Sequence, residues 1–221
     1  MPVYIISAPS GSGKTTLVGE LFRQVPRLRF SVSYTTRAPR GSEQDGREYY
    51  FVNRARFEAM IAGGELLEHA DVFGNYYGTA LRFVEEAERA GEDLVLDIDV
   101  QGALQVKQRL PAAVSIFIAP PDRATLAWRL TSRGLDAEAV IEKRLLAASR
   151  EIGAYNRYEF VVINDRLPES VSQLCAIVLC QRGDAGACQL ADACRLEGVS
   201  ERLRPVLESF GVASPPPARR S

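Results

Sequence analysis

Residues 7–16 read SAPSGSGKTT, which brings two closely spaced glycines and a Lys-Thr pair into one short segment. Gly11 and Gly13 let the backbone come close to a ligand, because glycine has no Cβ. Backbone N–H groups and the positive end of a following helix then attract phosphate. Lys14 adds a mobile positive charge for the outer phosphates, and the Thr15 hydroxyl is an oxygen ligand of the kind that Mg²⁺ prefers. The segment therefore predicts a site for a ligand that carries a polyphosphate.

The sequence on either side of this segment has the layout expected around a phosphate-binding loop. A short apolar run at residues 3–6 predicts a strand, and a leucine-bearing stretch at residues 15–22 predicts a helix. The usual pattern G-x-x-x-x-G-K-[ST] is broken at Ala8, which takes the place of the first glycine. Alanine fits there if its φ is negative, and we expect a negative φ. The alternative is a glycine-rich turn that binds nothing, and the flanking strand and helix argue against it.

Two groups of arginines stand where they could meet a phosphate. Arg37 and Arg40 lie in a polar loop, and a guanidinium matches phosphate geometry in a bidentate way, so we expect a second phosphate site there. The other group surrounds a glycine between two helical pieces, which could close over a reacting phosphoryl group; its members are Arg129, Arg133 and Arg144. Other arginines, Arg82 among them, are expected to be solvated surface charges.

Polar residues follow two of the apolar runs that predict buried strands. Asp97 and Asp99 end the run at residues 94–99, and Asn164 and Asp165 follow the run at residues 160–163. Because ligands bind beyond the carboxyl ends of the strands in an open parallel sheet, we expect these groups on the rim of the site. The alternative for the acids is that they cap helices or form salt bridges.

Apolar runs alternate with helical patterns along most of the chain, which favours an α/β fold with a parallel sheet covered on both faces. The expected strands lie at residues 3–6, 30–33, 49–52, 94–99, 114–118 and 160–163. The expected helices lie at residues 15–22, 57–61, 81–89, 101–109, 137–152 and 171–179, with a further helix that Asp122 caps. The tail also holds helical stripes, and a Pro-rich, basic end from residue 213 is expected to be disordered.

The composition is that of an ordinary globular protein, with 46% hydrophobic and 25% charged residues among 221. A net charge of −1 gives no electrostatic case for binding nucleic acid or a membrane, and no obligatory protein partner is expected. We see no secretion signal and no apolar run of about 20 residues, so we expect a cytoplasmic protein. The cysteines lack the spacing of common zinc sites and are expected to stay reduced; they are Cys175, Cys180, Cys188 and Cys194.

Four segments in this order resemble guanylate kinases: SAPSGSGKTT, SVSYTTRAPR at residues 31–40, LEHADVFGNYYGT at residues 67–79 and LDIDVQG at residues 96–102. The resemblance runs from about residue 3 to residue 181. It implies a phosphate-loop core at residues 1–33 and 80–181 with a helical lid near 125–150, and a GMP-binding insertion at residues 34–79. It also implies transfer of the γ-phosphoryl group of ATP to GMP, or to dGMP, with Mg²⁺. Residues 182–221 lie outside the resemblance and are expected to be partly helical, then disordered.

The same resemblance implies roles for individual residues. The residues expected to bind ATP are Ala8, Pro9, Ser10, Gly11, Ser12, Gly13, Lys14, Thr15, Thr16, Arg129, Asn164 and Asp165. The residues expected to bind GMP are Ser33, Arg37, Arg40, Tyr49, Glu68, Tyr77, Gly78, Thr79, Asp97 and Asp99. Those expected to act on the transferring phosphoryl group are Lys14, Arg40, Arg133 and Arg144, and Thr15 is the expected Mg²⁺ ligand.

The chemistry of the bases also favours guanine as the acceptor base. A carboxylate such as Glu68 can accept from both guanine N1–H and N2–H₂, and a hydroxyl such as Ser33 can donate to O6. Adenine would instead turn a lone pair toward Glu68, which costs a few kcal/mol in a buried site (about 1–3 for a neutral group, more for a charge). Two alternatives stay open: a kinase for another nucleoside monophosphate, and a non-catalytic module of similar fold that binds protein partners.

Overall fold

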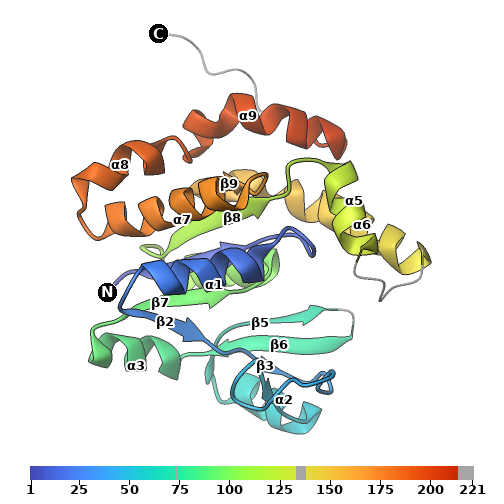
Figure 1. The fold of residues 1–221 in the computed structure, drawn as a ribbon. Helices are drawn as coiled ribbons and strands as arrows, with labels where there is room; N and C mark the ends of the chain where they lie inside the picture. Colours follow the sequence, from blue (N-terminus) through green and yellow to red (C-terminus); the bar gives the residue numbers. More distant parts are fainter. Residues whose placement is uncertain (73, 133–137, 214–221) are drawn as a thin grey trace. The chain divides into compact units, whose positions relative to one another are not determined.

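A computed structural model describes residues 1–72, 74–132 and 138–213 of the chain (Figure 1). The chain divides into two compact units. The first comprises Met1–Ile5 and Arg27–Val114, and the second comprises Ile6–Pro26 and Ser115–Ser221. The two units are described separately below.

The main sheet has five strands in the order β2-β7-β1-β8-β9. Its strands are β1 (Val3–Ser7), β2 (Leu28–Ser31), β7 (Asp93–Asp97), β8 (Val114–Ala119) and β9 (Phe160–Ile163). β2 pairs with β7, and β8 with β9, in parallel register. Every residue of β1 and β8 is buried, as expected for strands that are covered on both faces. The predicted α/β class with a parallel sheet and flanking helices is confirmed.

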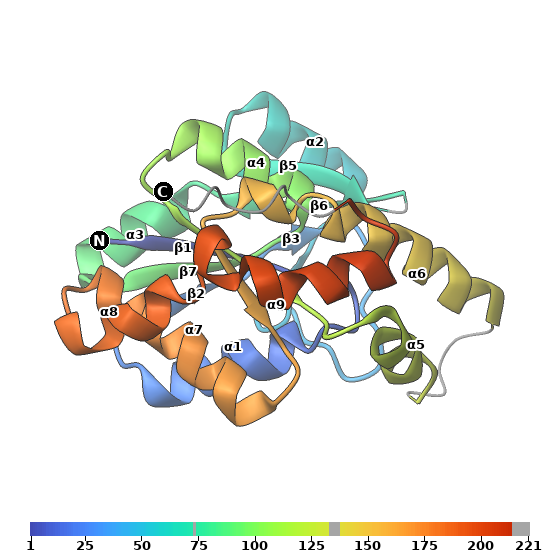
Figure 2. The same ribbon diagram turned by 90° about the horizontal axis from the view of Figure 1, so that it is seen from above.

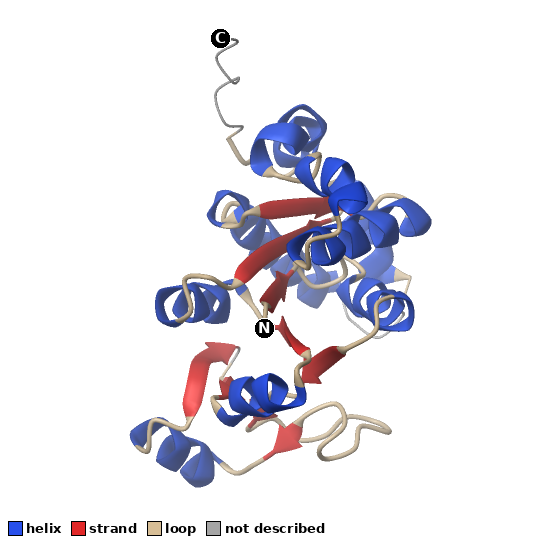
Figure 3. Ribbon diagram, turned by 90° about the vertical axis from the view of Figure 1, so that its left-hand side faces the viewer, coloured by secondary structure: helices blue, strands red, loops and turns tan. Residues whose placement is uncertain are grey.

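The first unit also contains a four-stranded sheet in the order β4-β3-β6-β5 (Figure 3). Its strands are β3 (Tyr34–Thr35), β4 (Tyr50–Phe51), β5 (Leu66–Val72) and β6 (Asn75–Ala80). The helix α2 (Arg54–Ala62) buries Phe57 and Met60 against Leu66. The antiparallel pair β5–β6 is absent from the strands expected above. Its pattern is hidden because Glu68, a charged residue, takes a buried position inside β5.

Two more helices complete the first unit. α3 (Arg82–Ala90) packs against β7, and α4 (Val100–Arg109) packs against β5. Asp99 caps α4, because its side chain accepts a hydrogen bond of 2.8 Å from Gly102 N. Arg82 is exposed, in agreement with the expected surface charge, but it also contacts aromatic side chains. Its guanidinium donates to Tyr34 Oη at 2.7 Å and lies over the rings of Tyr34 and Tyr50.

The second unit is mostly helical outside its strands. Its helices are α1 (Lys14–Gln24), α5 (Arg123–Thr131), α6 (Glu138–Ile152), α7 (Leu167–Gln181), α8 (Ala185–Asp192) and α9 (Leu196–Ser209), with a 3₁₀ turn at Tyr155–Arg157. α7 begins four residues before the expected start at Val171, because Pro168 suits a first helical turn that needs no N–H donor. α8 and α9 confirm that the tail is partly helical. The end of the tail expected to be disordered lies largely outside the described residues.

The expectation that all four cysteines stay reduced is wrong. Cys180 and Cys188 form a disulfide, with their Cα atoms 4.8 Å apart. They meet because α7 and α8 are joined by the short turn at residues 182–184 and pack against each other, a fold-back that the spacing of the cysteines does not reveal. Cys175 and Cys194 are free and buried, and burial raises the pKa of the Cys194 thiol to about 11.

None of the helices in the described part of the chain combines the length and the apolar character needed to cross a membrane.

Candidate nucleotide sites

The phosphate loop of the second unit connects β1 to α1. Gly11 and Gly13 have φ values of 90° and 88°, a left-handed backbone that favours glycine at both positions. Among the non-glycine residues that the structure describes, Arg27 alone has a positive φ, so the expected negative φ of Ala8 is confirmed. Ser12 N donates to Pro9 O at 3.1 Å and closes the turn before Gly13. The loop therefore has the backbone that its glycine spacing predicts.

The first turn of α1 follows the loop directly. Gly13 stands at the N-cap position and supplies no side-chain hydrogen bond, so the first N–H groups of α1 have no side-chain cap. Lys14, Thr15 and Thr16 occupy this turn, and both threonines are exposed. Leu17 and Leu21 are buried and fix the helix to the core. The turn thus presents N–H donors, an ammonium group and two hydroxyls at one helix end, an arrangement suited to phosphate.

Two residues expected to contact ATP hold the backbone of the loop. Asn164 Nδ2 donates to Ser12 O at 2.7 Å. Arg129 donates to the same carbonyl at 3.4 Å and to Asn164 O at 3.0 Å. A Cβ at Gly13 would collide with the Asn164 amide, so this glycine is also needed for close packing. Asn164 and Arg129 therefore fix the peptide of Ser12, whatever further contact they make with a nucleotide.

In the first unit, Arg37 is held by a carboxylate. Its Nη2 donates to Glu43 Oε1 at 2.9 Å, and only 9% of its side chain is exposed. The other oxygen of Glu43 accepts from Arg40 N at 2.8 Å, so one carboxylate fixes both ends of the Arg37–Arg40 turn. The hydrogen bond from Arg37 lowers the pKa of Glu43 and keeps this carboxyl ionised. Glu43 is absent from the residues predicted above, because nothing in its spacing marks it as a partner of Arg37.

Two tyrosines stand beside this arginine. Tyr49 lies under the Arg37 guanidinium, with 5.3 Å between the guanidinium carbon and the ring centre. Tyr77 meets Tyr49 edge to ring, with 5.8 Å between ring centres, and a hydrogen bond between Arg37 and Tyr77 contributes to the raised pKa of Arg37. Burial, followed by the negative charge of Asp97, raises the pKa of Tyr49. The Tyr49 phenol therefore stays protonated at neutral pH and can donate a hydrogen bond to an anion beside Arg37.

Glu68 is a buried carboxylate of the first unit, with 3% of the residue exposed. Thr79 Oγ1 donates to its Oε1 at 2.7 Å across the β5–β6 pair. Burial, helped by the negative charge of Asp99 and opposed by the Thr79 hydrogen bonds, raises the pKa of Glu68 to about 7. A Cβ at Gly102 would collide with Glu68 Oε2, so the start of α4 fits closely against the carboxylate. Glu68, Thr79 and Asp99, placed together by the sequence analysis, are brought together by the fold.

Side chains of α4 also hold the backbone of β5 on both sides of Glu68. Gln105 Oε1 accepts from His69 N at 3.2 Å, and its Nε2 donates to His69 O at 2.7 Å. Arg109 Nη1 donates to Leu66 O at 2.6 Å. β5 is an edge strand, so these bonds satisfy backbone groups that no neighbouring strand reaches. Neither residue was expected from the sequence, since their role depends on a strand that the pattern conceals.

The remaining expected residues are placed as follows. Arg133 lies outside the described residues. Arg144 is partly exposed on α6, whereas Ser10, Arg40 and Asp165 are exposed. Ser33 accepts a backbone hydrogen bond of 2.9 Å from Tyr50 N. Pro9 is buried in the loop, and a Cβ at Gly78 would come within 2.8 Å of Glu68 O. The geometry leaves the roles of these residues as predictions.

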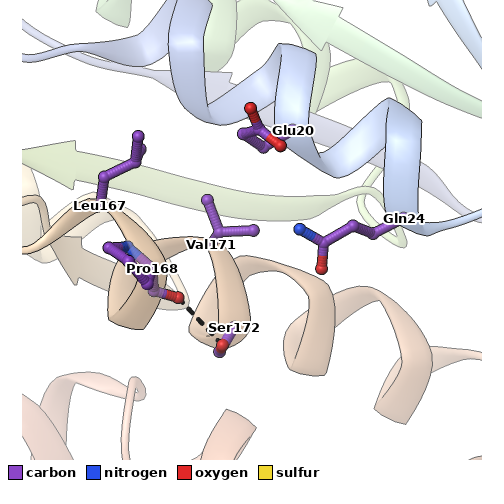
Figure 4. Close-up of a pocket in the computed structure, with 6 residues that line it drawn as sticks. All are labelled: Glu20, Gln24, Leu167, Pro168, Val171 and Ser172. Atoms are coloured by element: carbon purple, nitrogen blue, oxygen red, sulfur yellow. Dashed lines mark hydrogen bonds between the residues drawn. The ribbon is translucent and has the colours of Figure 1, made fainter.

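A separate cavity of about 320 Å³ lies between α1 and α7 (Figure 4). It is lined by Glu20, Gln24, Leu167, Pro168, Val171 and Ser172. None of these residues belongs to the phosphate loop or was expected to bind a nucleotide. The cavity is therefore not assigned to either nucleotide.

Comparison with known proteins decides the family. The model of the family described as "Guanylate kinase" matches residues 1–180. The chain belongs to the guanylate kinase family. A guanylate kinase of Koribacter versatilis is 51% identical over 97% of both chains, and one of Desulfitobacterium hafniense is 49% identical over 80% of this chain and 89% of its own. A crystal structure of guanylate kinase from Anaplasma phagocytophilum matches with a TM-score of 0.66 and 30% identity, over 93% of this chain and 96% of that chain.

The family match ends within α7, and α8 and α9 lie beyond it. The Koribacter guanylate kinase nevertheless aligns over almost the whole chain, so the extension has a counterpart in at least that relative. The resemblance expected from the four motifs is confirmed.

Proposed function

We propose that this chain is an ATP:GMP phosphotransferase, which moves the γ-phosphoryl group of ATP to GMP and yields ADP and GDP. The observation that carries the proposal is the buried Glu68 carboxylate beside Thr79, in a guanylate kinase family chain that keeps Gly11, Gly13, Lys14 and Thr15 of the phosphate loop. As an enzyme of this family, the chain acts as a nucleotide-binding kinase.

Glu68 is the residue that recognises the base of the acceptor nucleotide. Its Oε1 accepts from Thr79, and the remaining lone pairs of the carboxylate can accept from guanine N1–H and N2–H₂. Two donors on the base then offset the burial that raises the pKa of Glu68. Adenine presents an acceptor at N1 and would leave the carboxylate unpaired, which costs more than the ~1–3 kcal/mol of an unpaired neutral group. We assign Ser33 as the donor to O6 of the base, because its hydroxyl can donate a hydrogen bond.

Arg37, Arg40, Tyr49 and Tyr77 supply the GMP phosphate site. Arg37 is fixed by Glu43 before any ligand binds, so little side-chain entropy is lost when it meets the phosphate. Tyr49 and Tyr77 add hydroxyl donors. The phosphate of GMP is already anionic at neutral pH, so its attack needs no general base, and positioning with charge neutralisation suffices. Asp97, Asp99 and Gly78 line the same candidate site.

The phosphate loop supplies the ATP site. The backbone of residues 8–13 and the first turn of α1 cradle the phosphates, and Lys14 offsets charge on the transferring oxygens. Arg129 also serves the ATP site, and Asn164 and Asp165 serve its adenine side. Arg133 and Arg144 are assigned to the lid at about residues 125–150, which closes over the phosphoryl group and excludes water. The insertion at residues 34–79 carries the GMP site.

The residues present also fit a magnesium ion. Mg²⁺ keeps several waters and takes most of its other ligands from nucleotide phosphates, so it needs few protein ligands. The described residues contain no cluster of three or more His, Cys, Asp or Glu that could form an all-protein metal site, whereas the exposed Thr15 hydroxyl stands at the start of α1. Thr15 would hold the ion, which would neutralise charge on the phosphates.

We also assign the protein to the cytoplasm, where ATP and GMP are found, with no nucleic-acid, membrane or obligatory protein partner.

The test is ADP release with ATP and one acceptor at a time: GMP, dGMP, AMP, UMP or dTMP. We expect fast ADP release with GMP, slower or similar release with dGMP, and background rates with the other three. Equal rates with AMP or UMP would reject the assignment of Glu68 to guanine. Background rates with every acceptor would support the alternative of a non-catalytic binding module.

A further inference from the structure

We propose that the C-terminal helix α9 is a positioning element for the phosphate loop. It fastens α5 and β9, and these two elements carry Arg129 and Asn164, the side chains that hold the Ser12 carbonyl. The inference rests on the proposed binding of ATP at this loop. It assigns a role in the reaction to residues that lie beyond the family match, which ends at residue 180.

The end of α9 is joined to the start of α5. Ser209 Oγ, on the last residue of α9, accepts a hydrogen bond of 3.0 Å from Arg123 N, the first residue of α5. First-turn N–H groups of a helix have no partner inside the helix, so each needs an acceptor from elsewhere. The Asp122 side chain accepts a hydrogen bond of 2.6 Å from Thr125 N, and Ser209 Oγ is the acceptor for Arg123 N. Figures 1 and 2 show α9 extending from α8 toward α5.

The start of α9 is joined to β9. Cys194 O accepts from Val161 N at 2.8 Å, and Arg195 forms an isolated antiparallel bridge with Phe160. The Arg195 guanidinium also lies 4.6 Å from the centre of the Phe160 ring. β9 is the last strand in the sheet order, so this segment pairs with an edge that no other strand covers. Asn164 follows β9 directly.

An apolar face anchors α9 between these two attachments. The apolar residues of this face are almost fully buried. They are Val199, Leu203, Val206 and Leu207, with Phe210 directly after the helix. Burial of such apolar side chains stabilises the packing of α9, so this helix is firmly attached to the second unit.

On its other side, α5 touches the phosphate loop. A Cβ on Gly11 would lie 2.9 Å from Leu130 Cδ2 and 3.0 Å from Leu126 Cδ1, so both leucines pack closely on the loop backbone. Arg129, between them, donates to Ser12 O and to Asn164 O. A shift of α5 or β9 would therefore rotate the peptides whose N–H groups face the phosphates of ATP. The residues proposed to bind GMP all belong to the other unit.

The test is the kinetics of Ser209→Ala in the full-length chain, with Ser200→Ala as the matched control. Ser200 is on the same helix, and its hydroxyl donates to Glu197 O at 2.9 Å within α9. We expect Ser209→Ala to raise KM for ATP ~3- to 10-fold, the usual scale for loss of a helix-cap acceptor, with KM for GMP unchanged within about twofold. Ser209→Thr keeps the hydroxyl and should restore KM for ATP, and Ser200→Ala should match the wild type.

Three results would overturn the inference. One is an unchanged KM for ATP in Ser209→Ala, even with a lowered melting temperature, since α9 would then only stabilise the fold. Another is an equal rise in KM for both nucleotides. The third is an equal effect of Ser200→Ala. A wild-type chain that binds no ATP, measured by titration calorimetry, would overturn the proposed function together with the inference.

Discussion

At the scale of single residues, burial of Glu68 suits the proposed recognition of guanine but disfavours the ionised form of the carboxyl. Burial favours the protonated form of this carboxyl, and the Thr79 hydroxyl opposes that preference by donating to Oε1. The pKa of about 7 places the change of charge in the physiological range. Only the ionised form can accept from both guanine donors, so under the proposed role of Glu68 the protonation of this side chain would control acceptance of GMP.

This control predicts a pH dependence of GMP use. The folded-state pKa of Glu68 is raised from 4.5 to about 7, so the ionised fraction is high at pH 8 and falls as the pH drops through 7. Asp99 is the neighbouring charged group that faces it, and its negative charge acts in the same direction. KM for GMP should rise about tenfold from pH 8 to pH 6, the change expected for one titrating group. KM for ATP should change much less, and identical pH profiles for the two nucleotides would contradict the assignment.

At the scale of elements, β5 and α4 work as a pair. β5 carries Glu68 on a sheet edge, and α4 holds that edge through Gln105 on His69 and through Arg109 on Leu66. α4 itself starts at Asp99, whose side chain caps it. The carboxylate that we propose recognises guanine is therefore fixed by a helix that begins within the LDIDVQG motif.

Removal of this support should loosen GMP recognition alone. Gln105→Ala deletes both hydrogen bonds to His69, which typically contribute about 1 kcal/mol each, so we expect KM for GMP to rise ~3- to 20-fold. KM for ATP should stay within about twofold. The exposed Gln108, three residues further along α4, provides the control variant Gln108→Ala, which should match the wild type. Steady-state kinetics with each nucleotide varied in turn measures both constants; an effect on ATP alone would exclude this role.

The sequence predicts the elements with a clean periodicity and misses those that a functional residue disturbs. β1, β8, α1 and α4 follow their apolar patterns, and the phosphate loop follows its glycine spacing. The β5–β6 pair is concealed because Glu68 breaks the apolar pattern of a buried strand. The role of Glu43 depends on how its loop folds back onto Arg37, and the roles of Gln105 and Arg109 depend on contacts with a different element. No local pattern encodes such contacts.

At the scale of the whole molecule, the candidate ATP and GMP residues fall in different compact units. The phosphate loop with Arg129 and Asn164 belongs to the second unit, and the residues around Arg37 and Glu68 belong to the first. Each candidate site is thus supported by its own neighbours: Ser209 and α9 in one unit, Glu43 and α4 in the other. Because of this division, we expect mutations in the second unit to change KM for ATP and mutations in the first unit to change KM for GMP.

The disulfide of the second unit should stabilise the chain without taking part in the reaction. Cys180 and Cys188 are eight residues apart, and a loop of this size stabilises by ~2–3 kcal/mol when closed. We therefore expect a reductant to lower the melting temperature by several degrees, and Cys188→Ser to do the same. The reductant should then have no further effect on Cys188→Ser, which serves as the control. An unchanged melting temperature on reduction of the wild type, with thiol titration confirming the loss of the bond, would contradict this expectation.

We assign specificity for guanine to Glu68, and the kinetics of Glu68→Gln provide the sharpest test of this role. The amide keeps the size of the side chain but turns an N–H₂ donor toward a base edge that also donates. We expect kcat/KM for GMP to fall on the order of a hundredfold or more, because a buried hydrogen-bonded recognition is lost. The dissociation constant of ATP, measured by calorimetry on the same variant, should stay within about twofold of the wild type. Equal losses for the two nucleotides, or an unchanged kcat/KM for GMP, would contradict the account.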